Sequence, residues 1–295
     1  MISYFDHVYS HLRGNDLDAQ LERMKRAGFE LAEGKVRHRA GMLNGFVRMT
    51  GTYLEFISIV DEAEFEREAK TEDRIFRKAP KPSGIGAVSS NLDEVHRRLS
   101  SRFPDLKKPY ISGKKDDPES KPVWRFCPFP FSLTPGANVF PLEYLNSKGK
   151  PVTLKQGANS IFGVTGFLFC SDHVDARVSK WQEVLEPVTR EFSREGNTIR
   201  FGAQQLKWIT PEEYEQRFER PWQRFLESPC GEIAAVLLGV EDLDRARDYL
   251  SREGFFLRGD DNQAWTLYDD ATGFTFVLER GDPGLFLQQL NERSR

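Results

Sequence analysis

The sequence predicts an α+β protein in which a unit of one strand, one helix and three further strands occurs four times. A polar residue, an aliphatic residue and Asp recur in this order, with the aliphatic member at Leu17, Leu92, Val174 and Leu243 and spacings of 75, 82 and 69 residues. Apolar residues three to four positions apart follow each recurrence, as in a helix that packs on a sheet. A repeat of this period indicates one structural unit per copy.

The start of each expected helix carries a polar residue. Asp16, Asn91 and Asp242 suit N-caps, because their side chains accept hydrogen bonds from first-turn amides that have no helical partner. His173 holds this place in the third copy.

The ends of the first and fourth helices also match. Gly28 and Gly254 each precede Phe, eleven residues after the aliphatic member, and glycine suits the left-handed conformation at a helix end. Two strands joined by a Thr-Gly turn then follow in each copy, at residues 44–49 and 53–59 and at residues 264–268 and 274–278.

Polar connectors separate the four copies, at residues 78–83, 148–156 and 211–228. We expect an extra helix over residues 212–225, outside the repeat, and a solvated loop over residues 114–121. The connectors predict two domains, residues 1–150 and 151–295.

The composition is that of a soluble globular protein, with 39% hydrophobic and 29% charged residues in a chain of 295. A net charge of -3 gives no basic field for nucleic acid or an anionic membrane, so small-molecule or protein partners are expected. Three cysteines without CxxC spacing indicate a reducing compartment, and no apolar run approaches the ~18 residues of a membrane span. The sequence therefore predicts a cytoplasmic protein.

Short motifs in the first two copies point to a family. They are Phe5-Asp6-His7-Val8, Ala27-Gly28-Phe29, the stretch from His38 through Gly41 to Asn44, Gly51-Thr52-Tyr53-Leu54-Glu55 and Pro141-Leu142-Glu143-Tyr144. Over about residues 3–165 the chain resembles the glyoxalase-like branch of the vicinal-oxygen-chelate superfamily. The resemblance implies βαβββ modules that pair into open half-barrels, and therefore two half-barrel domains with the active cleft in residues 1–150.

The resemblance also implies metal ligands on the first and last strands of each module. His7, Glu55 and Glu143 take these places, whereas the first-strand place in the second copy falls near Gly84 or Gly86, which cannot ligate. One imidazole and two carboxylates suit a divalent metal that stabilises an enolate-type oxyanion as a Lewis acid. The identity of the metal is open, and a site without metal is the alternative.

No such ligand set is expected in the second half. Aligned turns put Val277 and Lys207 at the places that Glu55 holds in the first copy, with Gly163 or Thr165 on the first strand. We therefore interpret residues 151–295 as a degenerate domain that supports the first, forms a homodimer or closes over the cleft.

Three further residues are candidates for catalysis. His38 could act in acid–base chemistry at the cleft, Asn44 could orient substrate or a ligand water, and Arg48 could pair with a substrate carboxylate or with Glu55. For His38 the alternative is a position in a solvated loop without a role.

Two function classes follow from the residues and the resemblance. The first is a metal-dependent lyase or isomerase that acts on a small oxygen-rich substrate. The second is a metal-free protein that sequesters a small molecule, which the 23 Phe residues favour. A dioxygenase is less favoured, because oxygen activation usually uses two histidines and one carboxylate.

Overall fold

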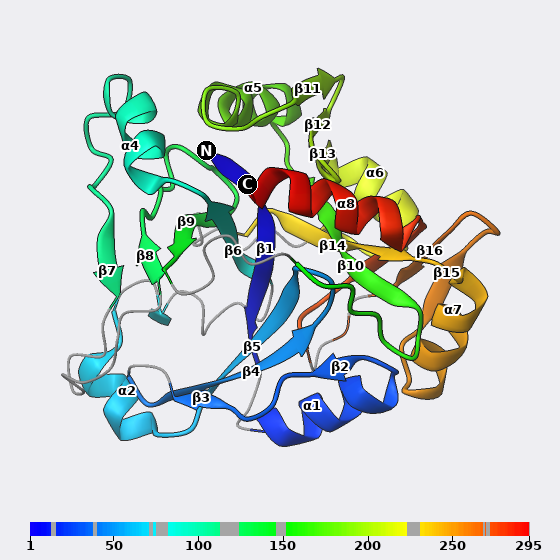
Figure 1. Ribbon diagram of the computed structural model, residues 1–295. Helices are drawn as coiled ribbons and strands as arrows, with labels where there is room; N and C mark the ends of the chain where they lie inside the picture. Colours follow the sequence, from blue (N-terminus) through cyan, green and yellow to red (C-terminus); the bar gives the residue numbers. More distant parts are fainter. Residues whose placement is uncertain are drawn as a thin grey trace.

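The computed structural model describes residues 1–12, 16–37, 40–70, 73–74, 82–112, 124–145, 152–222, 231–267, 269 and 272–294. Within these residues the chain forms two open mixed sheets, each built by two of the four copies, and the predicted α+β architecture of paired βαβββ modules is confirmed (Figure 1).

The first sheet, called sheet A, contains the strands of copies one and two in the order β2-β4-β5-β1-β6-β9-β8-β7. The first strands of the two copies are antiparallel neighbours at its centre, and each pairs in parallel with the last strand of its own copy. The elements are β1 (Ile2–His11), α1 (Leu17–Arg26), β2 (Glu30–Leu31), β3 (Val36–Arg37), β4 (Met42–Arg48), β5 (Tyr53–Ile59), α2 (Glu62–Glu68), β6 (Pro82–Ser89), α4 (Leu92–Ser100), β7 (Tyr110–Ser112), β8 (Trp124–Phe126) and β9 (Asn138–Tyr144).

The second sheet, called sheet B, repeats this topology with the strand order β11-β12-β13-β10-β14-β17-β16-β15. Its elements are β10 (Ile161–Cys170), α5 (Val174–Leu185), β11 (Phe192–Glu195), β12 (Thr198–Phe201), β13 (Gln204–Ile209), α6 (Pro211–Phe218), β14 (Ile233–Val240), α7 (Leu243–Arg252), β15 (Leu257–Gly259), β16 (Gln263–Thr266), β17 (Phe276–Arg280) and α8 (Pro283–Ser294).

The predicted helix boundaries are confirmed at both ends. The side chains of Asp16, Asn91 and Asp242 accept first-turn amides as N-caps, whereas His173 makes no side-chain cap bond. Gly28 and Gly254 follow α1 and α7 with φ of 84° and 79°, the left-handed conformation that glycine tolerates without strain.

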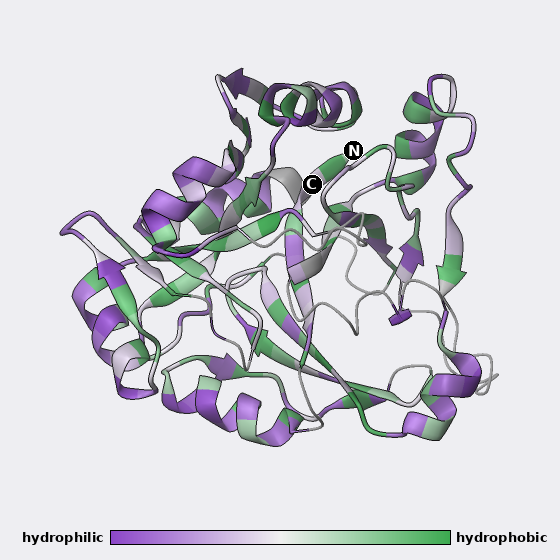
Figure 2. Cartoon of the chain, turned by 180° about the vertical axis from the view of Figure 1, so that it is seen from behind, coloured by the Kyte–Doolittle hydropathy of each residue, from purple (hydrophilic) through white to green (hydrophobic). Residues whose placement is uncertain are grey.

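Helices α1, α4, α5 and α7 cover one face of the sheets, here called the helix face (Figure 1). The helix faces of sheets A and B share one apolar core, in which the rings of Phe5 and Phe167 lie 5.7 Å apart and those of Phe56 and Phe274 5.4 Å apart. Figure 2 shows the hydrophobic stripes of the strands between helices with hydrophilic outer sides. None of the described helices is long and apolar enough to cross a membrane.

The opposite face of each sheet, here called the barrel face, carries its own small helix. Phe65 of α2 packs among Tyr9, Met42 and Ile57 of sheet A. Tyr214 and Phe218 of α6 pack in the same way on sheet B. The expected extra helix therefore exists, but it ends at Phe218, before a segment at residues 223–230 that lies outside the described residues.

Reciprocal hydrogen bonds join the two halves at irregular points of β1 and β10. The side chain of Gln204 accepts from the Phe5 amide at 2.6 Å and donates to the Phe5 carbonyl at 2.7 Å. In the other direction, the Val164 amide donates to the Thr52 hydroxyl at 3.0 Å. Buried backbone groups that a sheet irregularity leaves unpaired are thus satisfied by the other half of the chain.

Candidate functional site

His7 lies at the centre of sheet A, on the barrel face. In the register of β1 and β6 it is opposite Gly86, and a Cβ added at Gly86 would lie 2.0 Å from His7 Cε1. The imidazole therefore fills the space that a side chain at position 86 would need. Its ring stacks on Tyr53 at 4.5 Å and contacts Phe140 at 5.1 Å, so that it is held on both sides.

A β-bulge places the Asp6 carboxylate beside the same imidazole. Phe5 and His7 pair with the consecutive residues Ala87 and Gly86, which leaves Asp6 as the extra residue of β1. Adjacent strand residues normally point to opposite faces, but here Asp6 Oδ1 lies 2.7 Å from His7 Nδ1. Because an ionised carboxylate can only accept, Nδ1 carries the proton and Nε2 is turned towards the barrel face.

Glu55 of β5 faces the other nitrogen of His7. Its Oε2 lies 3.8 Å from Nε2, and its Oε1 accepts a hydrogen bond from Asn44 Nδ2. The Oδ1 atom of Asn44 is buried and has no hydrogen-bond partner within the described part of the chain. Asn44 therefore orients Glu55 directly and presents a free acceptor beside it.

Two tyrosine hydroxyls complete the network. Tyr144 donates to Asp6 Oδ2 at 2.7 Å, and Tyr53 is hydrogen-bonded to Tyr144. Burial and then the Asp6 carboxylate raise the pKa of both tyrosines well above the ordinary value of 10.0, so both hydroxyls stay protonated. Hydrogen bonds connect Tyr53 through Tyr144 and Asp6 to His7, and Glu55 Oε2 lies 3.8 Å from His7 Nε2.

The pKa values of His7 and Glu55 are both raised. Burial works against protonation of His7, but the charge and hydrogen bond of Asp6, with the charge of Glu55, outweigh it and raise the pKa above 6.5. Burial raises the pKa of Glu55 above 4.5, against the opposing effects of His7 and Asn44. If neither group carried a proton, His7 Nε2 and Glu55 Oε2 would face each other as two acceptors. The pair therefore favours states in which one proton is bound, either at His7 Nε2 or at Glu55.

The other predicted residues lie elsewhere. Glu143 accepts from the Leu92 amide at 3.3 Å and lies 3.5 Å from Arg125 Nη1, at the start of α4. Strand alternation explains this, since Phe140 contacts His7 from the barrel face and Glu143, three residues later, points to the helix face. Arg48 is exposed at the end of β4, and Asn44 rather than Arg48 bonds Glu55. His38 lies outside the described residues.

The strand registers identify the counterparts of Glu55 in the other copies. Glu55 pairs with Tyr9, which lies two residues after His7 in β1. In the other copies, the last-strand residue that pairs two positions after the counterpart of His7 is Leu142, Lys207 or Glu279. The register thus agrees with the expectation for Lys207, but puts Leu142 rather than Glu143, and Glu279 rather than Val277, in the equivalent place. Counterparts of His7 are Gly86, Gly166 and Leu237.

The predicted three-ligand metal set does not fit this arrangement. His7 and Glu55 come together, Glu143 is on the other face, and Asp6 is committed to His7 Nδ1 and Tyr144. Among the described residues no three His, Cys, Asp or Glu side chains are placed to hold a metal ion. The arrangement instead provides a carboxylate-oriented imidazole beside a second carboxyl group of raised pKa, a combination suited to proton transfer.

Sequence reasoning missed Asp6, Tyr53 and Tyr144 as members of the site. The alternation of an ideal strand would send Asp6 away from His7, and nothing in the local sequence signals the bulge. Tyr144 carries a usable signal, because it shares the strand parity of Phe140 and Leu142.

The glyoxalase-like domain family matches residues 5–185. The chain therefore belongs to the glyoxalase-like family, within the vicinal-oxygen-chelate superfamily that its paired βαβββ modules define. Comparison with curated proteins gives no match.

Solved structures with the same fold cover nearly the whole chain. A hypothetical protein from Staphylococcus aureus has a TM-score of 0.59 at 12% identity, with 95% of this chain and 100% of that chain covered. A mutant of 4-hydroxymandelate synthase from Streptomyces coelicolor has a TM-score of 0.55 at 11% identity, with coverage of 99% and 98%. The 2,2',3-trihydroxybiphenyl 1,2-dioxygenase of Sphingomonas wittichii strain RW1 has a TM-score of 0.51 at 12% identity, with coverage of 95% and 91%. At these identities the likeness concerns the fold alone.

Proposed function

We propose that this chain is an enzyme of the isomerase or lyase type that moves a proton within a small oxygen-rich substrate on the barrel face of sheet A. The observation that carries the proposal is the array Asp6–His7–Glu55, with 2.7 Å between Asp6 and His7 and 3.8 Å between His7 and Glu55. A carboxylate that holds one imidazole nitrogen leaves the other available as a base.

The proposed step starts from the state in which His7 is neutral and Glu55 holds the shared proton. In this state Nε2 accepts the proton of a C–H bond next to a substrate carbonyl, and Glu55 donates its proton to the carbonyl oxygen. The product is a neutral enediol, with imidazolium and carboxylate left on the enzyme. The Asp6 carboxylate stabilises that imidazolium. His7 then returns its proton to the neighbouring carbon, while the Glu55 carboxylate takes the hydroxyl proton from the carbon that lost its hydrogen, so that a new carbonyl forms and both enzyme groups regain their starting states.

Deuterium wash-in tests this proposal without knowledge of the natural substrate. Dihydroxyacetone, glycolaldehyde and 2-hydroxyacetophenone are incubated with the enzyme in D2O, and loss of the C–H signal next to the carbonyl is followed by NMR. We expect exchange that falls on the order of 100-fold or more in His7→Gln and is unchanged in His96→Gln, whose imidazole bonds the Leu106 carbonyl. Equal exchange in His7→Gln and the unmutated protein would contradict the proposal.

A divalent metal, as the family resemblance implies, stays a separate prediction. Elemental analysis of protein purified without chelator, repeated on Glu55→Ala, tests it. Stoichiometric metal that disappears in Glu55→Ala would replace the metal-free mechanism by a Lewis-acid one.

The aromatic surroundings of His7 favour a second function, the sequestering of a small aromatic molecule. Phe46 packs edge-on against Tyr53, and Phe126 against Phe140, so rings extend on both sides of the imidazole. Saturable binding of 2-hydroxyacetophenone without deuterium exchange would favour this function over catalysis.

A further inference from the structure

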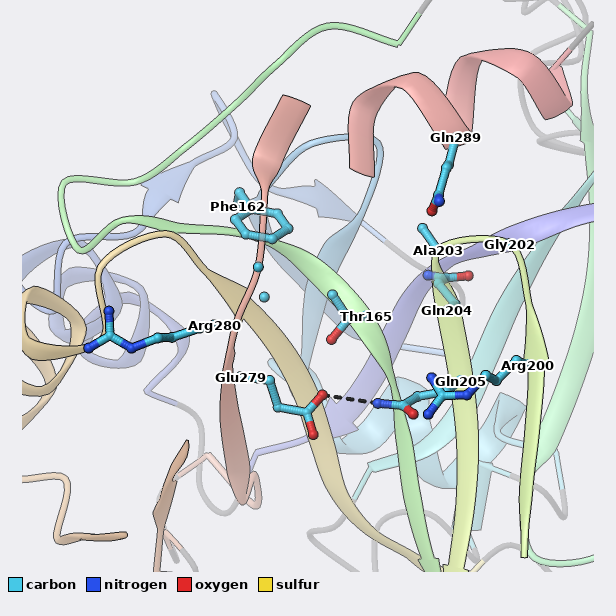
Figure 3. Close-up of a pocket in the computed structure, with 12 residues that line it drawn as sticks. Phe162, Thr165, Arg200, Gly202, Ala203, Gln204, Gln205, Glu279, Arg280 and Gln289 are labelled. Carbon is cyan, nitrogen blue, oxygen red and sulfur yellow. Dashed lines mark hydrogen bonds between the residues drawn. The ribbon is translucent and has the colours of Figure 1, made fainter. Parts of the chain in front are cut away.

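The second half of the chain contains a pocket on the barrel face of sheet B. It has a volume of about 270 Å³, the size for a small molecule, and opens between β12, β13, β14, β17 and α8 (Figure 3). Thr165, Arg200, Gln205 and Glu279 contribute polar side chains to its lining. None of these residues belongs to the site around His7, and residues 151–295 lack its imidazole counterpart, because Gly166 and Leu237 hold those places.

Glu279 lies at the place in the fourth copy that Glu55 has in the first. Two amides orient it, since Gln205 Nε2 donates to Oε2 at 3.0 Å and Gln263 Nε2 donates to Oε1 at 2.7 Å. Each carboxylate oxygen has two acceptor sites, so Glu279 can still accept a further hydrogen bond on both oxygens. Burial raises its pKa, against the opposing charges of Arg217, Lys207 and Arg200.

The hydroxyl of Thr165 is a second polar group of the pocket. Its Oγ1 is buried and has no hydrogen-bond partner among the described residues. Thr165 is the extra residue of the β10 bulge, at the place that Asp6 has in β1. A buried hydroxyl that is left unpaired is unfavourable, and a ligand that bonds to it removes that cost.

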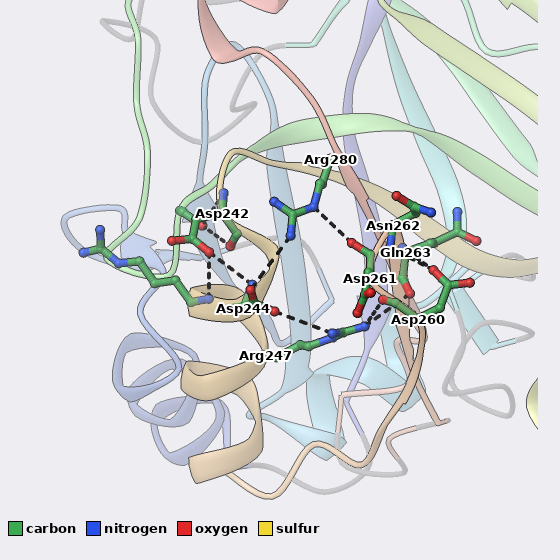
Figure 4. A network of polar contacts seen from close by, with 10 residues as sticks. Asp242, Asp244, Arg247, Asp260, Asp261, Asn262, Gln263 and Arg280 are labelled. Atoms are coloured by element: carbon green, nitrogen blue, oxygen red, sulfur yellow. Dashed lines mark hydrogen bonds and ion pairs between the residues drawn. The ribbon is translucent and has the colours of Figure 1, made fainter.

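Positive charge dominates around Glu279. Arg217, Lys207 and Arg200 all act on it, and Arg200 also lines the pocket. Arg280 is engaged elsewhere, because its Nε donates to the Asp261 carbonyl at 3.1 Å and its Nη2 lies 3.9 Å from Asp244 (Figure 4). Among the described residues that line the pocket, Arg200 is therefore the cation that is available to a ligand, and the excess of cations disfavours an ammonium group.

We propose that this pocket binds a small hydroxy carboxylate, with its carboxylate on Arg200 and its hydroxyl between Thr165 and Glu279. Arg pairs with carboxylates through two parallel hydrogen bonds, which is the geometry that an exposed guanidinium at a pocket wall offers. The site is separate from the one around His7 and does not depend on the function proposed there.

Calorimetric titration of the full chain with malate and succinate tests the proposal, because the two dicarboxylates differ by one hydroxyl. We expect malate to bind tighter than succinate by about tenfold, the equivalent of one hydrogen bond of about 1.4 kcal/mol. Arg200→Gln should weaken both by tenfold or more, whereas Arg102→Gln, the same charge change at an exposed site after α4, should not.

Thr165→Val provides the sharper variant. The change removes a hydroxyl that has no partner among the described residues, so the fold should keep its stability, while the preference for malate over succinate should largely disappear. Absence of saturable binding by both probes would overturn the proposal. Binding that persists in Arg200→Gln and Thr165→Val but disappears in His7→Ala would place the ligand in the first site and overturn it equally.

Discussion

Gly86→Ala should displace the imidazole on which the candidate site depends. The new Cβ would lie 2.0 Å from His7 Cε1 and 2.3 Å from His7 Nδ1, well inside contact distance. The ring cannot move aside cheaply, because Asp6 holds Nδ1 at 2.7 Å and Tyr53 stacks on it at 4.5 Å. Overpacking of this kind costs about 1–3 kcal/mol, and the bond to Asp6 is worth a similar amount if the ring is expelled.

A double-mutant cycle measures the effect. Urea unfolding is followed for the unmutated protein, Gly86→Ala, His7→Ala and the double variant. Gly86→Ala should lower the free energy of unfolding by about 1–3 kcal/mol, but much less in the His7→Ala background, where the ring is absent. Gly84→Ala is the matched control, since its Cβ would meet Tyr9 at 1.8 Å and His7→Ala should not relieve it. Additive effects of Gly86→Ala and His7→Ala would refute the placement of the imidazole over β6.

Two other predictions concern the same site. The pKa values of Glu55 and His7 in the folded protein are raised above 4.5 and 6.5. The stability that these two groups contribute is therefore complete below 4.5 and 6.5 and is lost as the pH rises through their folded pKa values. The urea midpoint of the unmutated protein should fall as the pH rises, and the midpoint of Glu55→Gln should fall less. A midpoint that is flat or rises over this range in both proteins would contradict the assignment. Gln204→Leu leaves the Phe5 amide and carbonyl without their side-chain partner, and should lower the free energy of unfolding by about 1–3 kcal/mol and also disturb His7, as seen in its NMR signals. An unchanged His7 spectrum would show that the bulge forms without Gln204.

The repeat and its boundaries could be predicted because they depend on local chemistry. The N-caps at Asp16, Asn91 and Asp242 and the left-handed glycines at Gly28 and Gly254 act within one helical turn, so the sequence carries the whole signal. Pairing of the copies followed from the family resemblance rather than from any residue pattern.

The composition of the site could be predicted only in part. His7 and Glu55 lie on the neighbouring strands β1 and β5, and their side chains meet as expected. Glu143 does not, because a difference of one residue in a strand moves a side chain to the other face, and Leu142 has the equivalent place. The position of Asp6 beside His7 could not be predicted without knowledge of the bulge. Gln204, about two hundred residues away in the chain, supports this bulge through its hydrogen bonds to Phe5.

The register also changes the expected counterpart of Glu55 in the fourth copy. Alignment of the Thr-Gly turns put Val277 at the place of Glu55, whereas the register with β14 puts Glu279 there. Loops of different length between the last two strands shift such an alignment by two residues, a shift that keeps the side-chain parity and so leaves no sign in the hydrophobic pattern.

Titration of the His7 imidazole by NMR, in the unmutated protein and in Asp6→Asn, tests the central claim most directly. We predict that His7 titrates above 6.5 in the unmutated protein, with the proton on Nδ1 in the neutral form, and that its pKa falls in Asp6→Asn, because the carboxylate charge that outweighs burial is lost. A His7 pKa at or below 6.5 in the unmutated protein, or one that Asp6→Asn leaves unchanged, would contradict the account of an Asp6-oriented base beside Glu55.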